Sequence, residues 1–455
     1  MPQREYQKYL FLSFLSPISL GIRIFSYPLF QKVSVSAQNL NYIVLIQIIQ
    51  RGNKLKVSII GQGYVGLTIS VFASKHYEVL GFDLNSKVVS DLNKGTSHIE
   101  GVDSKDIKDA ISRGKYRATM VGADIADSDI VVIAVPTPLD ANRKPDLSYI
   151  DSACKVIAEN LTGSALIINE STSYPGTLRD YIKPAIEKYS KQKFDHQYAI
   201  SPERVDPGRA DYNQKNTSRL YSGLTPKATN QTREFYSTFC DNLVEVSSPE
   251  VAEAAKLFEN TFRQVNIALV NELAQISHAL GIDVRETLDA AGTKPYGFMK
   301  FQPSAGVGGH CIPVDPSYLA DVAKKAGVTA TFIQRANEVN LEMPKYIAGR
   351  VAKDNGGSLK GKKVLVVGVA YKPNVADTRE SPAELLIDAL EDLGAVVSWS
   401  DPVVGNWQGK ESAGLNGAEI AVVVTKHDVV SAEDILNSAP YVFDTTGKVK
   451  GAVQL

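Results

Sequence analysis

The stretch that decides the fold is KVSIIGQGYVGLTIS, residues Lys56 to Ser70. An apolar run precedes Gly61, Gly63 and Gly66, and a second apolar run follows them. In this spacing the first glycine permits a tight turn after a strand, the second lets a pyrophosphate approach the backbone, and the third allows close helix packing. The N-terminus of the following helix offers N–H groups to phosphate. The stretch therefore predicts a strand, a dinucleotide-binding turn and a helix.

Asp83 strengthens this prediction, because it lies about 20 residues after Gly61, at the end of the next expected strand. A carboxylate at that point accepts hydrogen bonds from the adenosine ribose and repels a 2'-phosphate. The two signals together favour NAD over NADP. A glycine turn in some other α/β protein is the alternative.

From Lys56 onward, short apolar runs alternate with longer amphipathic ones, which is typical of parallel strands joined by helices. The expected strands are 57–60, 78–82, 130–134, 165–170 and 197–200. Ligands bind at the carboxyl ends of such strands. The loops expected there include VPTPLD (135–140), STSYPGT (171–177) and SPERVDPG (201–208).

A long helix is expected at 250–280, with Ser248 as its N-cap, Pro249 at its first position and Gly281 at its end. One face of its helical wheel is apolar and carries Phe258, Phe262, Val265, Leu269, Leu273 and Ile276. The opposite face carries Lys256, Asn260, Arg263 and Asn271. This polar stripe is either the solvated side of the helix or the wall of a buried polar cleft, and the wheel leaves both open. A second helix is expected at 330–354.

The last part of the chain predicts a second, smaller open α/β domain. Its expected strands are 363–367, 395–400, 419–424 and 441–443, with a helix at 383–393. Its first turn, in the loop GVAYKPNVADTRESP (368–382), lacks the GxGxxG spacing, so a second dinucleotide is not expected there. The expected divisions are an extension at 1–54, a cofactor domain at 55–247, a central helical region at 248–355 and a second ligand domain at 356–455.

The composition is that of an ordinary globular protein, with 455 residues, 44% apolar and 22% charged, and a net charge of -1. That charge gives no general reason to expect nucleic acid or an anionic membrane as a partner. Three cysteines at unrelated spacings argue against a disulfide framework and a metal site, and favour reduced thiols in the cytoplasm. The extension is expected to be poorly ordered or a mis-assigned start. Pro17, Arg23 and Pro28 interrupt its apolar run and disfavour a membrane span, and that run is too long and broken for a signal peptide.

Cys311 lies in GVGGHCIPVDP (306–316), a loop with glycines before the thiol and Asp315 four positions after it. Free cysteines are most often small buried hydrophobes, which is the reading we favour for Cys154 and Cys240. Glycines, His310 and an aspartate are untypical sequence neighbours for a buried core residue. A nearby cation such as Lys256 would favour the thiolate, so Cys311 is the expected nucleophile.

Taken together, these motifs resemble the UDP-glucose/GDP-mannose dehydrogenase family, and within it the branch acting on UDP-N-acetylhexosamines. The resemblance runs from about residue 56 to 446. It rests on GQGYVGL, VPTPLD, ESTSYPGT, SPERVDPG, Lys256 with Asn260, KPYGFMKFQPSAGVGGHCIPVDP and GVAYKPNVADTRESP, in that order. The resemblance implies an α/β fold of two Rossmann-like doubly wound domains joined by a long central helix, which also serves as a dimer interface.

The family's activity is a four-electron oxidation of a sugar C6 alcohol to a carboxylate with two NAD⁺. By resemblance, Cys311 forms a thiohemiacetal and then a thioester, and Asp315 assists the water that cleaves it. Lys256 and Asn260 hold the developing oxyanion. Glu203 and Thr137 join the proton and water network. No metal is expected.

The resemblance also implies binding residues. For the cofactor they are Gly61, Gly63, Tyr64, Val65, Gly66, Asp83, Lys87, Thr137 and Thr172. For the UDP-sugar they are Glu203, Arg204, Lys256, Asn260, Arg263, Tyr296, Gly308, Lys372 and Arg379.

The expected substrate is UDP-N-acetylglucosamine, with UDP-N-acetylmannosamine and UDP-glucose as alternatives. Two departures from the branch bear on sugar selectivity. Lys300 stands where many relatives have proline, and 219–223 replaces a lysine-containing turn. Two rivals remain: a two-electron hydroxy-acid dehydrogenase, and a sugar-nucleotide-binding protein without activity.

Overall fold

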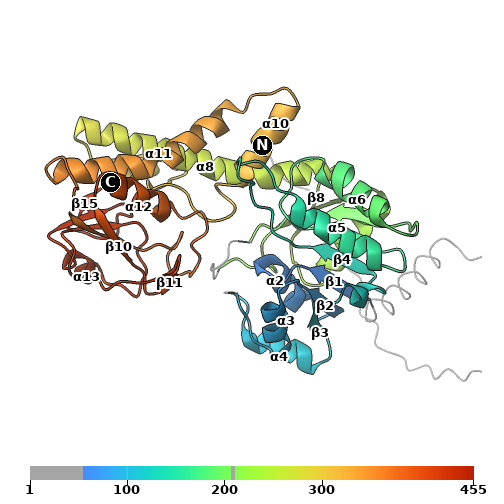
Figure 1. Ribbon diagram of the computed structural model, residues 1–455. Coiled ribbons are helices and arrows are strands. Elements are labelled where there is room, and N and C mark those ends of the chain that lie inside the picture. The colour runs from blue at the N-terminus through green and yellow to red at the C-terminus, as the bar shows by residue number, and fades with distance from the viewer. Residues whose placement is uncertain (1–54, 100, 206–210) are drawn as a thin grey trace, which may run out of the picture. The chain divides into compact units, whose positions relative to one another are not determined.

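The structure is a computed structural model that describes residues 55–99, 101–205 and 211–455 (Figure 1). The expected extension at 1–54 and the end of the SPERVDPG motif, 206–208, lie outside the described residues.

The first sheet has the strand order β3-β2-β1-β4-β5-β6-β7-β8. Every neighbouring pair is parallel except β6 and β7, which are antiparallel. Its strands are β1 (Lys56–Ile60), β2 (Glu78–Phe82), β3 (Tyr116–Thr119), β4 (Ile130–Ile133), β5 (Leu166–Asn169), β6 (Gln197–Ile200), β7 (Arg219–Gly223) and β8 (Leu243–Glu245). Strand order reverses at β1 and β4, so the loops after these strands border the crevice where such sheets bind ligands.

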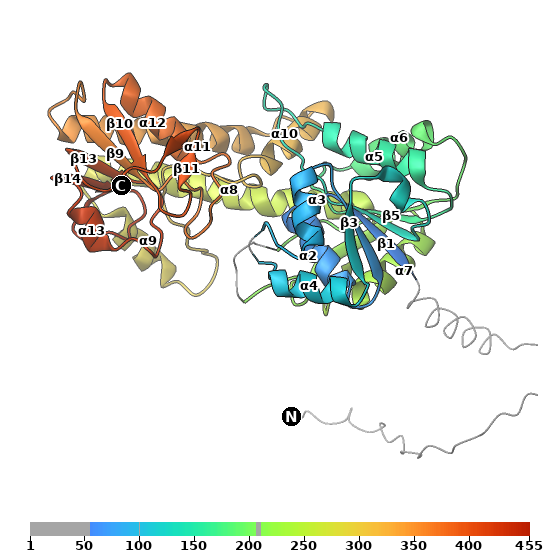
Figure 2. The ribbon, with the colours of Figure 1, turned by 60° about the horizontal axis from the view of Figure 1, so that its bottom comes forward.

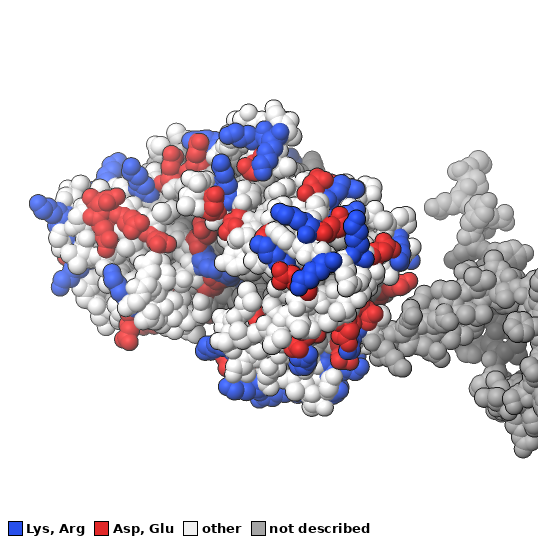
Figure 3. Space-filling model, turned by 45° about the vertical axis from the view of Figure 1, so that its right-hand side comes forward, with Lys and Arg blue, Asp and Glu red and all other residues white. Residues whose placement is uncertain are grey.

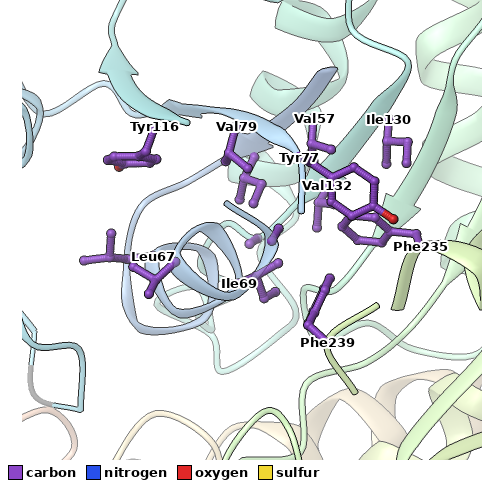
Figure 4. Packing of buried hydrophobic residues seen from close by; sticks show 14 of the residues in the cluster. Val57, Leu67, Ile69, Tyr77, Val79, Tyr116, Ile130, Val132, Phe235 and Phe239 are labelled. Carbon is purple, nitrogen blue, oxygen red and sulfur yellow. The ribbon is translucent and has the colours of Figure 1, made fainter. Parts of the chain in front are cut away.

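Alternate side chains of these strands feed two cores, one on each face of the sheet. Figure 2 shows the helices that lie against this sheet. On one face, Val57, Val79 and Val132 pack against Leu67 and Phe235, as Figure 4 shows. The helices on that face are α2 (Tyr64–Ala73), α3 (Ser86–Asn93), α4 (Ser104–Ser112) and α7 (Pro226–Ser237). The other face is covered by η1 (Gly122–Ile125), α5 (Ser148–Asn160), η2 (Thr177–Ile182) and α6 (Lys183–Tyr189).

The five strands expected here are present, but three further strands were not predicted. One of them corrects an expectation: 219–223 is the buried strand β7 and not a turn. Arg219 and Ser222 interrupt the apolar pattern of this segment, yet both side chains are buried, and Arg219 has ion-pair partners inside the protein. An alternating apolar pattern was therefore missing.

The second sheet is parallel throughout and has the order β10-β9-β13-β14-β15. Its strands are β9 (Lys363–Val367), β10 (Val396–Ser400), β13 (Ile420–Val423), β14 (Tyr441–Asp444) and β15 (Val453–Gln454), with a separate hairpin of β11 (Asn406–Trp407) and β12 (Lys410–Glu411). Helix α12 (Pro382–Asp392) packs on one face and α13 (Ala432–Leu436) on the other. The second α/β domain is thus confirmed as an open doubly wound sheet.

The long helix is α8 (Pro249–Leu280), which ends at Gly281 in the left-handed conformation as expected. Ser248 is at the N-cap position, but its side chain makes no capping hydrogen bond. Near its start Ala252 joins a core of the first sheet, and near its end Val270 and Ala274 join a core of the second. The adjoining helices are α9 (Val284–Gly292), α10 (Asp315–Lys325) and α11 (Thr331–Asp354).

The exposure of the two faces of α8 is the reverse of that expected for a simple amphipathic helix. On the polar face Asn271 is buried and Lys256 and Asn260 are half-buried, although Arg263 is exposed. On the apolar face Phe258 is 62% exposed and Leu269 60%. The polar stripe is therefore largely a cleft wall, and the apolar stripe faces outward.

Lysines and arginines alternate with aspartates and glutamates over the face that Figure 3 displays. Among the described residues, no helix combines the length and the apolar character needed to span a membrane.

Candidate active site

The glycine turn after β1 has the geometry that a dinucleotide requires. Gly61 has φ +93°, and a side chain on it would collide with the backbone of Ala134. A side chain on Gly66 would collide with the carbonyl of Gly61, which explains the close approach of α2 to the strand. Gly63 has open space around it and caps α2 without a side-chain hydrogen bond, so the start of this helix lies open to a phosphate.

Asp83 is built into the same turn. One oxygen of its carboxylate accepts from the Gln62 N–H at 2.9 Å and the other from the Asn85 N–H at 2.8 Å. Gln62 is buried, and its amide oxygen accepts from Tyr116 at 2.8 Å, which fixes the turn from below. A carboxylate so placed fits an adenosine ribose, and the turn and Asp83 together fit NAD.

The catalytic candidates Asn260 and Asp315 meet directly. The Asn260 amide donates to the Asp315 carboxylate at 2.5 Å, across from α8 to the first residue of α10. Asp315 is buried, and burial raises its pKa to about 6 even though Lys256 and Asn260 act to lower it. This carboxyl group therefore changes its protonation state near neutral pH, as a general base must.

Cys311 lies one turn before Asp315, and its carbonyl accepts from the Asp315 N–H at 2.8 Å. The thiol is half-exposed and in no disulfide, whereas Cys154 and Cys240 are buried. Burial raises the pKa of Cys154 to about 12 and that of Cys240 to about 11, which leaves both inert as expected.

The glycines before Cys311 serve close packing. A side chain on Gly308 or Gly309 would crowd Tyr371, and the Gly309 N–H donates to the Arg379 carbonyl at 2.9 Å. The Cys311 loop therefore rests directly on the 368–382 loop of the second α/β domain. The protein packed around the His310 ring lowers its pKa, as do the charges of Arg379 and Lys256.

Tyr318 of α10 connects this region with the VPTPLD loop. Its hydroxyl donates to the Pro138 carbonyl at 3.0 Å and interacts with the Thr137 hydroxyl. The Cys311 loop, Thr137 and the Asn260–Asp315 pair are thus held in one region. Thr172 is half-buried in the neighbouring STSYPGT loop, beside the buried Ser171 that bonds Val135.

Glu203 is held by a buried cluster that sequence reasoning missed: Glu170, Gln214, Arg219 and Tyr236. Burial alone would raise the pKa of Glu203, but Arg219, Gln214, the Val205 N–H and Lys256 together lower it. Its neighbour Arg204 forms an ion pair with Glu259 of α8 at 2.6 Å. The signal for this cluster in the sequence is that Glu170 ends one predicted strand and Glu203 follows another.

A cavity of about 1000 Å³ lies between α8 and the carboxyl ends of β13 and β14. Its walls include apolar rings and four cationic side chains, and the cations are Arg263, Lys300, Lys426 and Lys448. Phe262 and Phe301 meet edge to face in its wall, with ring centroids 5.9 Å apart. Of these residues only Arg263 was named as a binding residue, since the distant β13 and β14 loops carry no motif.

Four further predicted binding residues, Arg379, Lys372, Tyr296 and Lys87, do not line this cavity. Arg379 pairs with Asp377 in its own loop, with Nη2–Oδ2 at 2.5 Å, and neither Arg379 nor Lys372 lines the cavity. Tyr296 is 72% exposed, with the Lys294 ammonium over its ring. Lys87 is exposed and forms an ion pair with Asp91 at 2.8 Å. Among the described residues no group of three or more His, Cys, Asp or Glu side chains is placed to bind a metal.

Family models match almost all of the chain after the extension. They are the NAD binding domain of the UDP-glucose/GDP-mannose dehydrogenase family at 55–240, its central domain at 250–342 and its UDP binding domain at 365–451. The chain belongs to this family. It is an NAD-dependent oxidoreductase of the nucleotide-sugar dehydrogenase class.

Two relatives show how the substrate divides within the class. UDP-N-acetyl-D-mannosamine dehydrogenase of Pyrococcus horikoshii is 35% identical over 381 residues, 82% of this chain and 90% of that protein. UDP-N-acetyl-D-glucosamine 6-dehydrogenase of Pseudomonas aeruginosa is also 35% identical, over 356 residues, 77% of this chain and 83% of that protein. The solved structure of UDP-D-ManNAc dehydrogenase from P. horikoshii has a TM-score of 0.78 and 32% identity, and covers 88% of this chain and 98% of that one.

Proposed function

We propose that this protein oxidises the C6 hydroxyl of UDP-N-acetylglucosamine to the carboxylate, in a four-electron reaction through Cys311. The relative from P. aeruginosa and the motifs around Cys311 support this substrate. UDP-N-acetylmannosamine is the second candidate, supported by the equally similar P. horikoshii relative. UDP-glucose is the third.

The cavity beside the second sheet suits the UDP group. A diphosphate carries negative charge and a uracil is flat, and the cavity offers four cations and aromatic rings. Phe258, Phe262 and Arg263 of its wall are next to Asn260 in sequence, so a nucleotide bound here has its sugar directed along α8 toward the catalytic residues. Arg379 and Lys372 belong to the 368–382 loop, on which the Cys311 loop rests, so they would bind the substrate on that side.

In the first oxidation the sugar alcohol gives up the proton of its C6 hydroxyl and a hydride from C6, which leaves an aldehyde. Lys256 and Asn260 stabilise the negative charge on the oxygen, the lysine by its charge and the asparagine by a hydrogen bond. Asp315 accepts the hydroxyl proton, directly or through water. When bound, NAD⁺ supplies the hydride acceptor, one molecule for each of the two oxidations.

In the second oxidation the Cys311 thiolate adds to the aldehyde carbon, which gives a thiohemiacetal. Loss of a hydride from that carbon and of the proton from its hydroxyl leaves a thioester on the sulfur. Water attacks the thioester carbonyl, Asp315 takes a proton from that water, and the thiolate leaves as the C–S bond breaks. Glu203 and Thr137 hold the water network beside it.

The observation that carries this proposal is the hydrogen bond of Asn260 to a buried Asp315 beside the Cys311 loop. A two-electron hydroxy-acid dehydrogenase needs neither the thiol nor this carboxyl group. Their presence together also disfavours a binding protein without activity.

A panel of UDP-sugars with NAD⁺ tests the proposal. We expect NADH formation at 340 nm with UDP-N-acetylglucosamine at a higher kcat/KM than with UDP-N-acetylmannosamine or UDP-glucose. A higher kcat/KM for another UDP-sugar would change the substrate, and no NADH with any of them would contradict the proposed function.

We further propose that the protein works in the cytoplasm, where NAD⁺ is available, as a homodimer or higher oligomer. The exposed apolar stripe of α8 supports self-association, because an apolar patch on a helix face marks a contact surface. The division into regions 1–54, 55–247, 248–355 and 356–455 is likewise a proposal.

A further inference from the structure

Glu203 belongs to a buried polar cluster at the carboxyl ends of β5 and β6. Arg219, the first residue of β7, lies at its centre with 4% of its side chain exposed. One nitrogen of the guanidinium, Nη1, donates to Glu170 at 2.6 Å and to the Ser201 hydroxyl at 3.0 Å. The other, Nη2, donates to Glu203 at 3.3 Å and to the amide oxygen of Gln214.

Gln214 completes a ring of hydrogen bonds around Glu203. Its amide nitrogen donates to the same carboxylate oxygen, Oε2, that Arg219 contacts. The other oxygen accepts from the Val205 N–H at 2.5 Å and the Arg204 N–H at 2.7 Å. Both oxygens of Glu203 are thus fixed, and its carboxylate cannot turn without breaking this ring.

The guanidinium group of Arg219 is also held in place by Glu170 and Tyr236. Tyr236 of α7 donates to the same Glu170 oxygen that Arg219 contacts, and the guanidinium carbon lies 4.4 Å from the centre of the Tyr236 ring. The second Glu170 oxygen is buried and has no hydrogen-bond partner among the described residues. Glu170 therefore has a single bonded oxygen, and that oxygen serves to orient Arg219.

The charges in the cluster do not balance if both carboxyl groups are ionised. One guanidinium faces two buried carboxyl groups, Glu170 and Glu203, and Glu203 also has a second cation nearby, Lys256 of α8. Burial raises the pKa of Glu170 to about 7, and the negative charge of Glu203 acts in the same direction. The pKa of Glu203 is lowered. Cys240, after α7, also faces Arg219 as a neutral thiol.

We propose that Arg219 is the positioning residue of Glu203: it orients this carboxylate toward the substrate and keeps it charged, while Glu170 and Tyr236 hold Arg219 in place. This inference rests on the proposed function, in which Glu203 joins the proton and water network. It adds a residue that touches neither substrate nor cofactor. It also gives the strand β7, unexpected from the sequence, a part in catalysis.

Arg219→Gln tests the inference through the pH dependence of kcat. In the wild type the rate should rise with pH through about 6, following Asp315. In the variant Glu203 keeps its proton to a higher pH, so the rate should depend on the ionisation of Glu203 as well as that of Asp315, and the rise should move to higher pH. We expect kcat to fall at least about tenfold at its plateau, with KM for NAD⁺ changed less than about twofold. An unmoved pH profile at full kcat would overturn the proposal.

A double variant separates positioning from simple charge neutralisation. Arg219→Gln alone leaves Glu170 buried without a cation, which destabilises the fold. Arg219→Gln with Glu170→Gln removes that penalty, so its melting temperature should return toward that of the wild type while kcat stays low. Recovery of kcat together with stability would show that Arg219 only neutralises Glu170, and would overturn the proposal.

Two further variants complete the set. Glu170→Gln alone keeps an amide oxygen that can accept from Arg219 and Tyr236 in the same place, so Arg219 stays oriented and most of the activity should remain; a loss of kcat equal to that of Arg219→Gln would show that the charge of Glu170 controls the rate and would overturn the proposal. Arg233→Gln, an exposed arginine of α7, is the matched control and should behave as the wild type. A wild-type enzyme that forms no NADH with any UDP-sugar contradicts the proposed function itself. An active wild type with an unaffected Arg219→Gln contradicts only the role of Arg219.

Discussion

Asp315 is a carboxyl group that the fold removes from water, with 1% of the residue exposed. Burial disfavours its charged form, so the folded protein holds the proton more tightly than the unfolded chain does. A raised carboxyl pKa lowers stability as pH rises from about 4 to about 6, and the full penalty remains above that range. This loss of stability occurs at the position where the proposed reaction needs a base.

Asp315→Asn should therefore stabilise the protein and inactivate it. Above pH 6 we expect a gain in the free energy of unfolding of about 2 kcal/mol, which shrinks as pH falls toward 4. The plateau kcat should fall at least about 100-fold because the base is lost. Urea denaturation at several pH values and NADH assays measure the two effects. Asp321→Asn, on the same helix in a surface ion pair with Lys325, is the control and should change neither appreciably.

Lys426 provides a test of the nucleotide cavity. A charge-assisted hydrogen bond is worth about 1.5–3 kcal/mol, so Lys426→Gln should raise KM for the UDP-sugar at least about tenfold. KM for NAD⁺ should change less than about twofold. Steady-state kinetics with each substrate varied in turn make the comparison. Lys360→Gln, an exposed lysine of the same domain, should leave both values unchanged, and equal rises in both KM values for Lys426→Gln would refute the assignment.

Residues with a local backbone reason could be predicted from the sequence. Gly61, Gly66 and Asp83 act within one turn, and their spacing encodes that turn. Arg219 and Glu170 could not be found, because 49 positions separate them and their contact exists only once β5 and β7 belong to one sheet. The resemblance supplied the meeting of Asn260 with Asp315, which helix spacing alone does not give.

At the scale of elements, α8 is joined to the cofactor side by a buried glutamate. The Glu253 carboxylate accepts from the Gly176 N–H at 2.7 Å, the Leu178 N–H at 3.0 Å and the Ser173 hydroxyl at 3.2 Å. Lys256 and Asn260 follow one and two turns later on α8. Glu253 therefore fixes the STSYPGT loop against the helix that carries the catalytic residues.

Glu253→Ala should lower the free energy of unfolding by about 2 kcal/mol or more, because two buried N–H groups lose their acceptor. KM for NAD⁺ should rise as well, since Thr172 lies in the loosened loop. Denaturant unfolding and kinetics measure these effects. Glu250→Ala, three residues earlier in a half-exposed ion pair with Arg179, should cost less than about 1 kcal/mol; equal costs for both variants would show that the hydrogen bonds of Glu253 contribute no more to stability than a surface ion pair.

Whether an element could be predicted depended on where its side chains find partners. β4 is a continuous apolar run, and β1 and β9 are largely apolar, so all three were predictable. β7 holds a buried arginine and a buried serine, so its pattern follows the polar cluster instead of the core. The faces of α8 inverted for the same reason: its polar side chains pair with Asp315 and with Asn340 of α11.

At the scale of the whole molecule, the described residues leave the outward apolar stripe of α8 uncovered. Leu269 is 60% exposed, Ile276 49% and Leu280 68%. If a second copy covers the stripe, Leu269→Glu should shift the protein toward monomer at micromolar concentration, as measured by sedimentation velocity. Val429→Glu, a substitution of an exposed apolar residue of the second α/β domain, should leave the oligomeric state unchanged. An unchanged assembly in both variants would rule out this stripe as the interface.

The account depends most on Cys311 as the nucleophile that carries the aldehyde to the acid. The direct measurement is the amount of NADH formed per UDP-sugar consumed, in the wild type and in Cys311→Ser. We predict two NADH and one carboxylate per sugar for the wild type, and no net carboxylate for the variant. Two NADH per sugar at the wild-type rate from Cys311→Ser would contradict the covalent route.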